Sequence, residues 1–106
     1  MLTVGVVDMA IVRVLAICGS LRRASSNRAL VDAATLLARD GVEVSVYDQL
    51  ERLPAFNPDL DSELPLPDVA SFRLALQTCD AVLISSPEYA HGVPGVLKNA
   101  LDWVVS

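Results

Sequence analysis

Two polar loops hold most of the side chains in this sequence that can bind a ligand. The first loop follows an apolar run at 14–18 and precedes an amphipathic segment. Its polar residues are Ser20, Arg22, Ser25, Ser26 and Asn27. The start of a helix favours a phosphate, because free backbone N–H groups and the positive end of the helix dipole meet there. Hydroxyl groups and an arginine can donate to the phosphate oxygens, so we expect a phosphate site in this loop.

The first loop matches neither of two common phosphate-binding motifs. A Walker loop ends in Gly-Lys-Ser/Thr, and the dinucleotide fingerprint has a second glycine where Leu21 stands. Gly19 still allows a tight turn directly after the strand. Helix capping is the simpler role for the run at 25–27, but it does not account for Ser20 together with Arg22.

The second loop follows an apolar stretch at 80–85 and is rich in turn residues. Four of its residues are expected to bring backbone amides and one aromatic face close to a planar ring. They are Pro87, Glu88, Tyr89 and Gly92. The lone His91 is more typical of an exposed loop residue than of a catalyst. Ser85 and Ser86 lack the Gly-x-Ser-x-Gly setting of a nucleophile elbow, so acyl transfer is not indicated.

The hydrophobic periodicity predicts strands and helices in strict alternation. The strands are expected at 12–18, 42–47 and 80–85, and the helices at 27–39, from Pro67 and from Pro94. This order gives a parallel sheet by the usual crossover rule, with both loops at the carboxyl ends of strands. The segment 49–67 carries most of the prolines, so we expect a long surface loop there.

Each expected helix has an apolar stripe with helical spacing. The stripes are Leu30, Ala33, Ala34 and Leu37 in the first helix, Val69, Phe72 and Leu76 in the second, and Leu97, Ala100, Leu101 and Val104 in the third. Gly41 is expected to end the first helix, since glycine is favoured just past a helix end. Trp103 is expected to pack on the face of the last helix.

The composition is that of one small domain in the cytoplasm. The chain has 106 residues, of which 53% are hydrophobic, but Asp8 and Arg13 interrupt its most apolar stretch, so no membrane span is indicated. The N-terminus lacks the features of a secretory signal. Cys18 and Cys79 form no CxxC pair, and we expect two buried reduced thiols.

The charge pattern favours a local anion site on an acidic body. A net charge of −5 argues against a general surface for nucleic acid or anionic lipid. Arg22, Arg23 and Arg28 nevertheless gather around the first loop, whereas the acids spread over 48–63.

Taken together, the two loops resemble those of the NADPH-dependent FMN reductase family, a flavodoxin-like group that includes quinone, chromate and azo-dye reductases. The resemblance covers about residues 12–105. It rests on the motifs Gly19-Ser-Leu-Arg22-x-x-Ser25-x-Asn27 and Ser86-Pro-Glu-Tyr-x-x-Gly-x-Pro-Gly-x-Leu-Lys-Asn-Ala-Leu-Asp-Trp103. The resemblance implies that Ser20, Arg22, Ser25 and Asn27 hold the FMN phosphate. It also implies that Pro87, Glu88, Tyr89 and Gly92 line the isoalloxazine ring.

The resemblance implies an FMN-dependent NAD(P)H oxidoreductase, in which hydride passes from NAD(P)H to FMN and then to a quinone, free flavin or similar acceptor. No catalytic side chain and no metal are expected, because the flavin carries the redox chemistry. Two alternatives stay open: a flavin-binding electron carrier without turnover, and an inactive truncated fragment. The full-length protein is expected to be a homo-oligomer that binds neither nucleic acid nor membrane.

The implied fold is a flavodoxin-like doubly wound parallel α/β sheet, of which only the first three strands are present, in the order 2-1-3. Residues 12–106 are then the N-terminal part of an FMN-binding domain and residues 1–11 an extension, with Met9 as an alternative start. The family continues through two further strands, so we expect this chain alone to be poorly stable, to self-associate or to bind flavin weakly. Ala90 stands where the family commonly has Asn.

Overall fold

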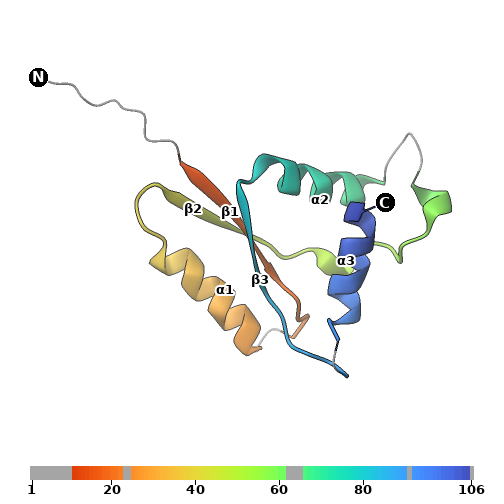
Figure 1. The fold of residues 1–106 in the computed structure, drawn as a ribbon, viewed down its shortest axis with the longest axis horizontal. Coiled ribbons are helices and arrows are strands. Elements are labelled where there is room, and N and C mark those ends of the chain that lie inside the picture. The colour runs from red at the N-terminus through yellow and green to blue at the C-terminus, as the bar shows by residue number, and fades with distance from the viewer. Residues whose placement is uncertain (1–10, 23–24, 62–65, 91, 106) are drawn as a thin grey trace, which may run out of the picture.

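A parallel sheet forms the centre of the computed structural model, which describes residues 11–22, 25–61, 66–90 and 92–105 (Figure 1). The strands are β1 (Val12–Cys18), β2 (Val42–Tyr47) and β3 (Ala81–Ser85), and they lie in the order β2-β1-β3. The α-helices are α1 (Ser26–Leu37), α2 (Pro67–Thr78) and α3 (Gly95–Val105). Both neighbours of β1 run parallel to it, which confirms the predicted fold and strand order.

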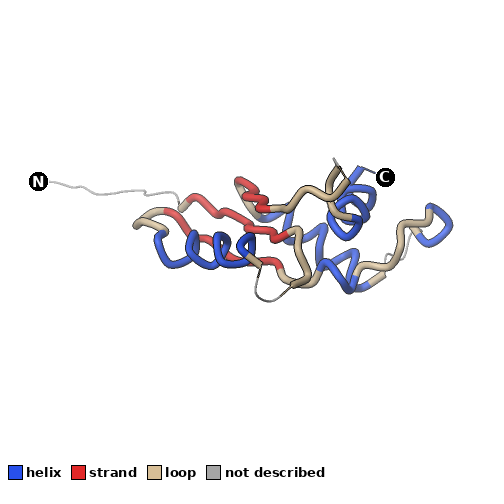
Figure 2. Tube along the Cα trace, turned by 90° about the horizontal axis from the view of Figure 1, so that it is seen from below, coloured by secondary structure: helices blue, strands red, loops and turns tan. Residues whose placement is uncertain are grey.

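The central strand β1 is apolar on both faces because helices cover it from both sides. Its residues alternate between the faces, as in any strand. Leu15 and Ile17 join the larger core with residues of α2 and α3, whereas Ala16 and Cys18 join a smaller cluster with Val31 of α1. Figure 2 shows the helix α1 running alongside the strands.

The larger core is built around two aromatic contacts. The rings of Tyr47 and Phe72 lie 4.9 Å apart and link the end of β2 to α2. The rings of Phe56 and Trp103 are also 4.9 Å apart, and they meet edge to face. Trp103 is 1% exposed, which confirms the expected packing on the face of the last helix.

Polar contacts fasten the long segment between β2 and α2 to helix α3. The Pro54 carbonyl accepts from the Asn99 side-chain amide at 2.9 Å and from the Trp103 indole N–H at 2.8 Å, and Asn99 in turn accepts from the Phe56 N–H at 2.7 Å. Arg73 of α2 donates both to the Trp103 carbonyl and to the Asp61 carboxylate. These bonds fix the course of a segment that has little regular structure of its own.

The structure corrects several details of the predicted helices. Helix α1 spans Ser26–Leu37 instead of 27–39, and its fully buried residue is Val31, whereas Leu30 and Leu37 are exposed. Gly41 does not end α1, because Ala38 follows the helix directly; Gly41 has a φ of +87° in the turn before β2. In α3 the third buried residue is Trp103. The expected Leu101 and Val104 are partly exposed, because no described element covers that side.

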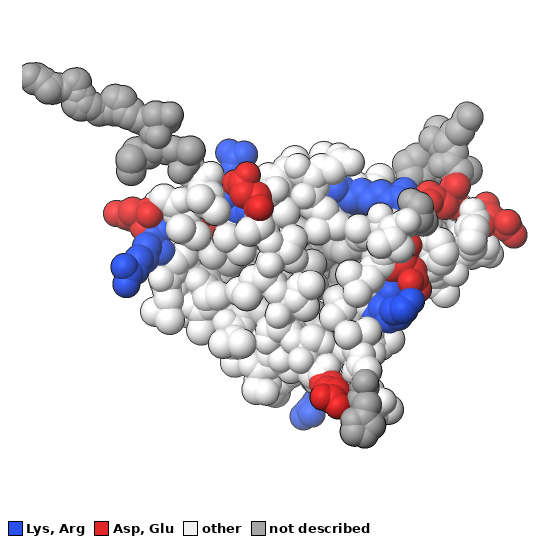
Figure 3. Space-filling model, viewed as in Figure 1, with Lys and Arg blue, Asp and Glu red and all other residues white. Residues whose placement is uncertain are grey.

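Strand β3 lies at an open edge of the sheet and exposes apolar side chains. The exposed fractions of Val82, Leu83 and Ile84 lie between 37% and 45%. In the view of Figure 1, β3 runs down the middle, and the same area of Figure 3 carries no charged side chain. Among the described residues, no helix is long and apolar enough to cross a membrane.

Candidate functional site

The two polar loops meet directly where β1 and β3 end. The Gly19 N–H donates to the Ser85 carbonyl at 2.8 Å, which continues the ladder between the strands. A Cβ atom on Gly19 would lie 2.6 Å from the Ser86 Oγ and 2.8 Å from its Cβ. Only glycine therefore fits at position 19, and the reason is the close approach of the second loop.

The loop between β1 and α1 is organised by its own serines. Ser25 is the N-cap of α1, and its hydroxyl accepts from the Arg28 N–H at 3.0 Å. The Ser20 hydroxyl accepts from the Arg22 N–H at 3.3 Å. Each hydroxyl still has its own hydrogen to donate, so these contacts leave both groups able to bind an anion.

Asn27 is oriented by a residue of the other loop. The Ser85 hydroxyl, at the end of β3, donates to the side-chain oxygen of Asn27 at 2.8 Å. This bond identifies the oxygen end of the Asn27 amide and leaves its NH2 group as the end able to donate to a ligand. Ser85 is 7% exposed. A serine directly after the apolar run 81–84 is the signal that could have identified it from the sequence.

The loop between β3 and α3 closes on itself as a tight turn. The N–H groups of Tyr89 and Gly92 each donate to the other residue's carbonyl, at 3.0 and 2.9 Å. These two amides are therefore occupied, which corrects the expectation that both are exposed to a ligand. Ala90 within the turn has a φ of +51°, a conformation in which Asn is several-fold enriched over other non-glycine residues.

A cavity of about 370 Å³ lies between the two loops. Its lining residues are Gly19, Ser20, Leu21, Arg22, Tyr89, Pro94, Gly95 and Val96. The arginine and hydroxyl groups come from the first loop, and the aromatic ring and apolar side chains come mainly from the second. This cavity lies at the carboxyl ends of β1 and β3, where the strand order reverses and α/β proteins bind their ligands.

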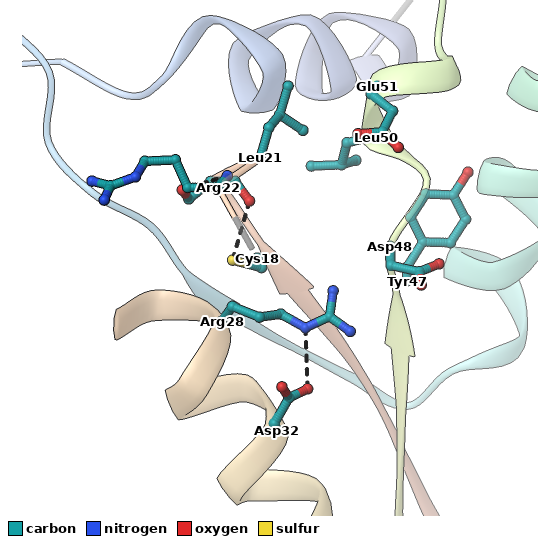
Figure 4. Close-up of a pocket in the computed structure, with 10 residues that line it drawn as sticks. Cys18, Leu21, Arg22, Arg28, Asp32, Tyr47, Asp48, Leu50 and Glu51 are labelled. Atoms are coloured by element: carbon teal, nitrogen blue, oxygen red, sulfur yellow. Dashed lines mark hydrogen bonds and ion pairs between the residues drawn. The ribbon is translucent and has the colours of Figure 1, made fainter. Parts of the chain in front are cut away.

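A second cavity, of about 460 Å³, lies on the other side of the first loop, between the ends of β1 and β2 (Figure 4). Its lining residues are Cys18, Ser20, Leu21, Arg22, Arg28, Asp32, Tyr47, Asp48, Leu50 and Glu51. Arg28 and Asp32 form an ion pair at 3.1 Å on one wall. Burial raises the pKa of Tyr47, and nearby Asp68 raises it further.

The structure brings together three of the predicted site residues, since Ser20, Arg22 and Tyr89 line the same cavity. Ser25 and Asn27 lie at the start of α1 and do not line this cavity. Pro87, Glu88 and Gly92 of the second loop do not line it either. Arg23 and His91 fall outside the described residues. The described residues contain no group of three or more His, Cys, Asp or Glu side chains placed to hold a metal ion.

The second cavity and the apolar residues around the first do not follow from the sequence motifs. Arg28 and Asp48 belong to different elements, and their shared cavity follows from the side-by-side pairing of β1 with β2. Leu21 lies in the first loop and Val96 in the first turn of α3, but only the folded arrangement brings them to the same cavity. The sequence signal available for the second cavity was an acid directly after β2, together with a loop rich in serine and arginine after β1.

The strand order and the two loops define a flavodoxin-like α/β protein. Residues 12–106 match the model of the NADPH-dependent FMN reductase family, and the chain belongs to that family. The chain is 33% identical to the flavoenzyme NAD(P)H:(acceptor) oxidoreductase FerB from Paracoccus denitrificans. The TM-score to that structure is 0.80, over 91% of this chain and 52% of FerB.

Relatives from plants and bacteria are similar over most of this chain. It is 39% identical to the NAD(P)H:quinone oxidoreductase of Solanum tuberosum, over 88% of this chain and 50% of that protein. It is 40% identical to a 2-hydroxy-1,4-benzoquinone reductase from a Burkholderia species, over 86% of this chain and 49% of that protein. The chain therefore spans about half the length of the curated relatives it matches.

Proposed function

We propose that this chain binds FMN across its two loops, as part of an NAD(P)H-dependent oxidoreductase that reduces a quinone or a similar small acceptor. The observation that carries the proposal is the cavity shared by Ser20, Arg22 and Tyr89. Residues 67 and 69 positions apart supply a cation and a hydroxyl on one side and an aromatic ring on the other. The reductases named above, which match this chain, support the choice of reaction.

The first loop would bind the phosphate of FMN. The side chains proposed to hold it are Ser20, Arg22, Ser25 and Asn27. Arg22 is exposed, and the Asn27 amide is oriented by Ser85 so that its NH2 group is left to donate. The start of α1 adds the positive end of a twelve-residue helix. The donor set therefore fits a phosphate group.

The second loop would line the ring of FMN. The residues proposed for this role are Pro87, Glu88, Tyr89 and Gly92, and the apolar Leu21 and Val96 face the same cavity. Tyr89 is 53% exposed, so its ring is available for stacking. Bound FMN would accept hydride from NAD(P)H and deliver electrons to the acceptor, while these residues fix its position.

The phosphate assignment can be tested by removing the Arg22 guanidinium. In R22A the loss of one charge-assisted contact should weaken FMN binding by about 1.5–3 kcal/mol. Riboflavin, which lacks the phosphate, should bind the variant and the wild type alike. Arg39, an exposed arginine beyond the other end of α1, provides a matched control in R39A. Fluorescence titrations measure all the affinities, and equal losses for FMN and riboflavin would refute the assignment.

The proposal also covers turnover, assembly and location. Oxidation of NAD(P)H by the FMN-loaded protein, followed in absorbance at 340 nm, separates an oxidoreductase from an electron carrier or an inactive fragment. We propose that the full-length protein is a cytoplasmic homo-oligomer, and that residues 1–11 are an extension of the FMN-binding domain. A flavin-loaded protein that oxidises neither NADH nor NADPH would favour the electron carrier.

A further inference from the structure

A single buried serine joins the end of β3 to the start of α1. The Ser85 hydroxyl donates to the side-chain oxygen of Asn27 at 2.8 Å, and the Ser85 carbonyl accepts from the Gly19 N–H at the same distance. Figure 1 shows the end of β3 close to the start of α1. Ser85 therefore contacts the first loop through its backbone and through its side chain.

The orientation of the Asn27 amide decides how this residue meets an anion. The two ends of an Asn amide have nearly the same size, but the oxygen only accepts hydrogen bonds and the NH2 group only donates them. Rotation about the last side-chain torsion exchanges the two ends, and this torsion is soft. An anion is attracted by the NH2 group and repelled by the oxygen. A phosphate site that uses Asn27 therefore needs one orientation of its amide.

Ser85 favours the orientation that an anion needs. With the oxygen of Asn27 bound to the Ser85 hydroxyl, the NH2 group is the end left for a ligand. In the reverse orientation the Ser85 hydroxyl would accept from the NH2 group, and its own hydrogen would need another acceptor. Ser85 is 7% exposed, so water cannot readily supply that acceptor, and an unsatisfied buried hydroxyl is costly.

We propose that Ser85 is a positioning residue of the phosphate site, whose hydroxyl holds the Asn27 amide with its NH2 group available to the anion. The inference rests on the proposed function for the place of the phosphate. It adds a residue from the end of β3 that acts on the ligand only through Asn27. Its effect should therefore depend on the phosphate and disappear when the Asn27 amide is removed.

The first test compares FMN with riboflavin, which lacks the phosphate, in fluorescence titrations. S85A should weaken FMN binding about threefold to fivefold, because the freed amide must be ordered by the ligand itself, and should leave riboflavin binding unchanged. S45A removes a hydroxyl from β2, at an exposed residue that pairs with Leu15, and should bind both ligands as the wild type does. Circular dichroism verifies the fold of each variant.

A pair of variants with nearly the same side-chain shape isolates the hydroxyl from its packing. S85T keeps the hydroxyl and S85V replaces it with a methyl group, while both enlarge the buried side chain. S85T should bind FMN about threefold to fivefold more tightly than S85V does. Equal affinities of these two variants for FMN would overturn the proposal.

A double-mutant cycle shows whether Ser85 acts through Asn27. N27A should weaken FMN binding about tenfold, because a charge-assisted hydrogen bond is lost. In the N27A background, S85A should cause no further loss. A merely structural effect of S85A would persist in that background and would weaken riboflavin as well, and either result would overturn the proposal.

Inorganic phosphate, followed by NMR at the side-chain amide of Asn27, separates this inference from the proposed function. Half of the signal shift should need about three to five times more phosphate in S85A than in the wild type. If phosphate binds with this dependence but FMN does not bind, the proposed function is refuted and the role of Ser85 stands. If S85A binds FMN and phosphate as tightly as the wild type, only the role of Ser85 is refuted. A wild type that binds neither refutes both.

Discussion

The two sides of the sheet are packed very differently. On the side of α2 and α3, the core residues Leu15, Ile17, Phe72 and Trp103 are at most 5% exposed. On the side of α1, Leu30 and Leu37 are exposed. The edge strand β3 exposes apolar residues on both faces, because Val82 and Ile84 pair with Leu15 and Ile17 while Leu83 pairs with Ala16. Both sides have the same apolar periodicity in the sequence. The difference shows that periodicity selects a helix or a strand, whereas burial depends on a second element that packs against it.

We expect substitutions on the two sides of the sheet to lower the free energy of unfolding by very different amounts. Replacing Phe72, which is 2% exposed, with alanine should lower the free energy of unfolding by about 3–5 kcal/mol, because a large cavity opens beside Tyr47. Replacing Leu37, which is 79% exposed, should change it by less than about 0.5 kcal/mol. Urea denaturation followed by circular dichroism measures both. Similar losses in F72A and L37A would mean that the two sides are equally packed.

A charged side chain on the edge strand β3 tests whether its exposed edge causes association between molecules. The unpaired edge of β3 has neither a charged residue nor a proline, so it should pair with other molecules. The association constant of V82K should be at least about tenfold lower than that of the wild-type chain, as measured by sedimentation velocity. L36K adds the same charge on α1, at a residue that is 84% exposed, and should associate as the wild type does.

Covering the exposed edge of β3 should prevent the association between molecules that the open edge allows. A protein extended by the second half of a relative should be monodisperse, because β3 would then lie inside the sheet. A wild-type chain of 106 residues that stays monomeric at every concentration, unfolds cooperatively and binds FMN tightly would contradict both expectations.

The smallest predicted effect concerns Tyr47 on the well-packed side. Burial, and then Asp68, raise its pKa above the ordinary value of 10.0. The unfolded chain therefore releases the phenolic proton at lower pH than the folded chain, so stability falls as the pH rises above about 10. Y47F should reduce this fall by less than about 1 kcal/mol between pH 9 and 11 in urea denaturation experiments. An unchanged slope would indicate that the hydroxyl titrates as if it were in solvent.

Sequence reasoning identified the strands and the two loops because these depend on local signals, whereas the strand order followed from the resemblance to the family. Ser25 caps α1, and apolar runs mark β1 and β3, whatever the rest of the chain does. It did not identify contacts that join distant residues. The bond from Ser85 to Asn27 links positions 58 residues apart, and its existence depends on how β1 and β3 pair.

The same reason explains the two errors of side-chain burial. The stripe of Leu30 and Leu37 has correct helical spacing, but the residue of α1 that meets the sheet is Val31. In α3, Trp103 takes the buried position because Pro54 and Phe56 come to meet it from a segment about fifty residues earlier. The spacing of apolar residues along one helix does not show which distant segment will pack against it.

The close approach at Gly19 makes the two loops mechanically dependent on each other. Since Ser86 fills the space where a Cβ atom would lie, any larger residue at position 19 would act as a wedge driven between the ends of β1 and β3. Such a wedge would widen the crevice without changing any group proposed to touch a ligand. The shape of the crevice and the chemistry of its walls are thus controlled by different residues, and natural or laboratory variation can alter one while the other is retained.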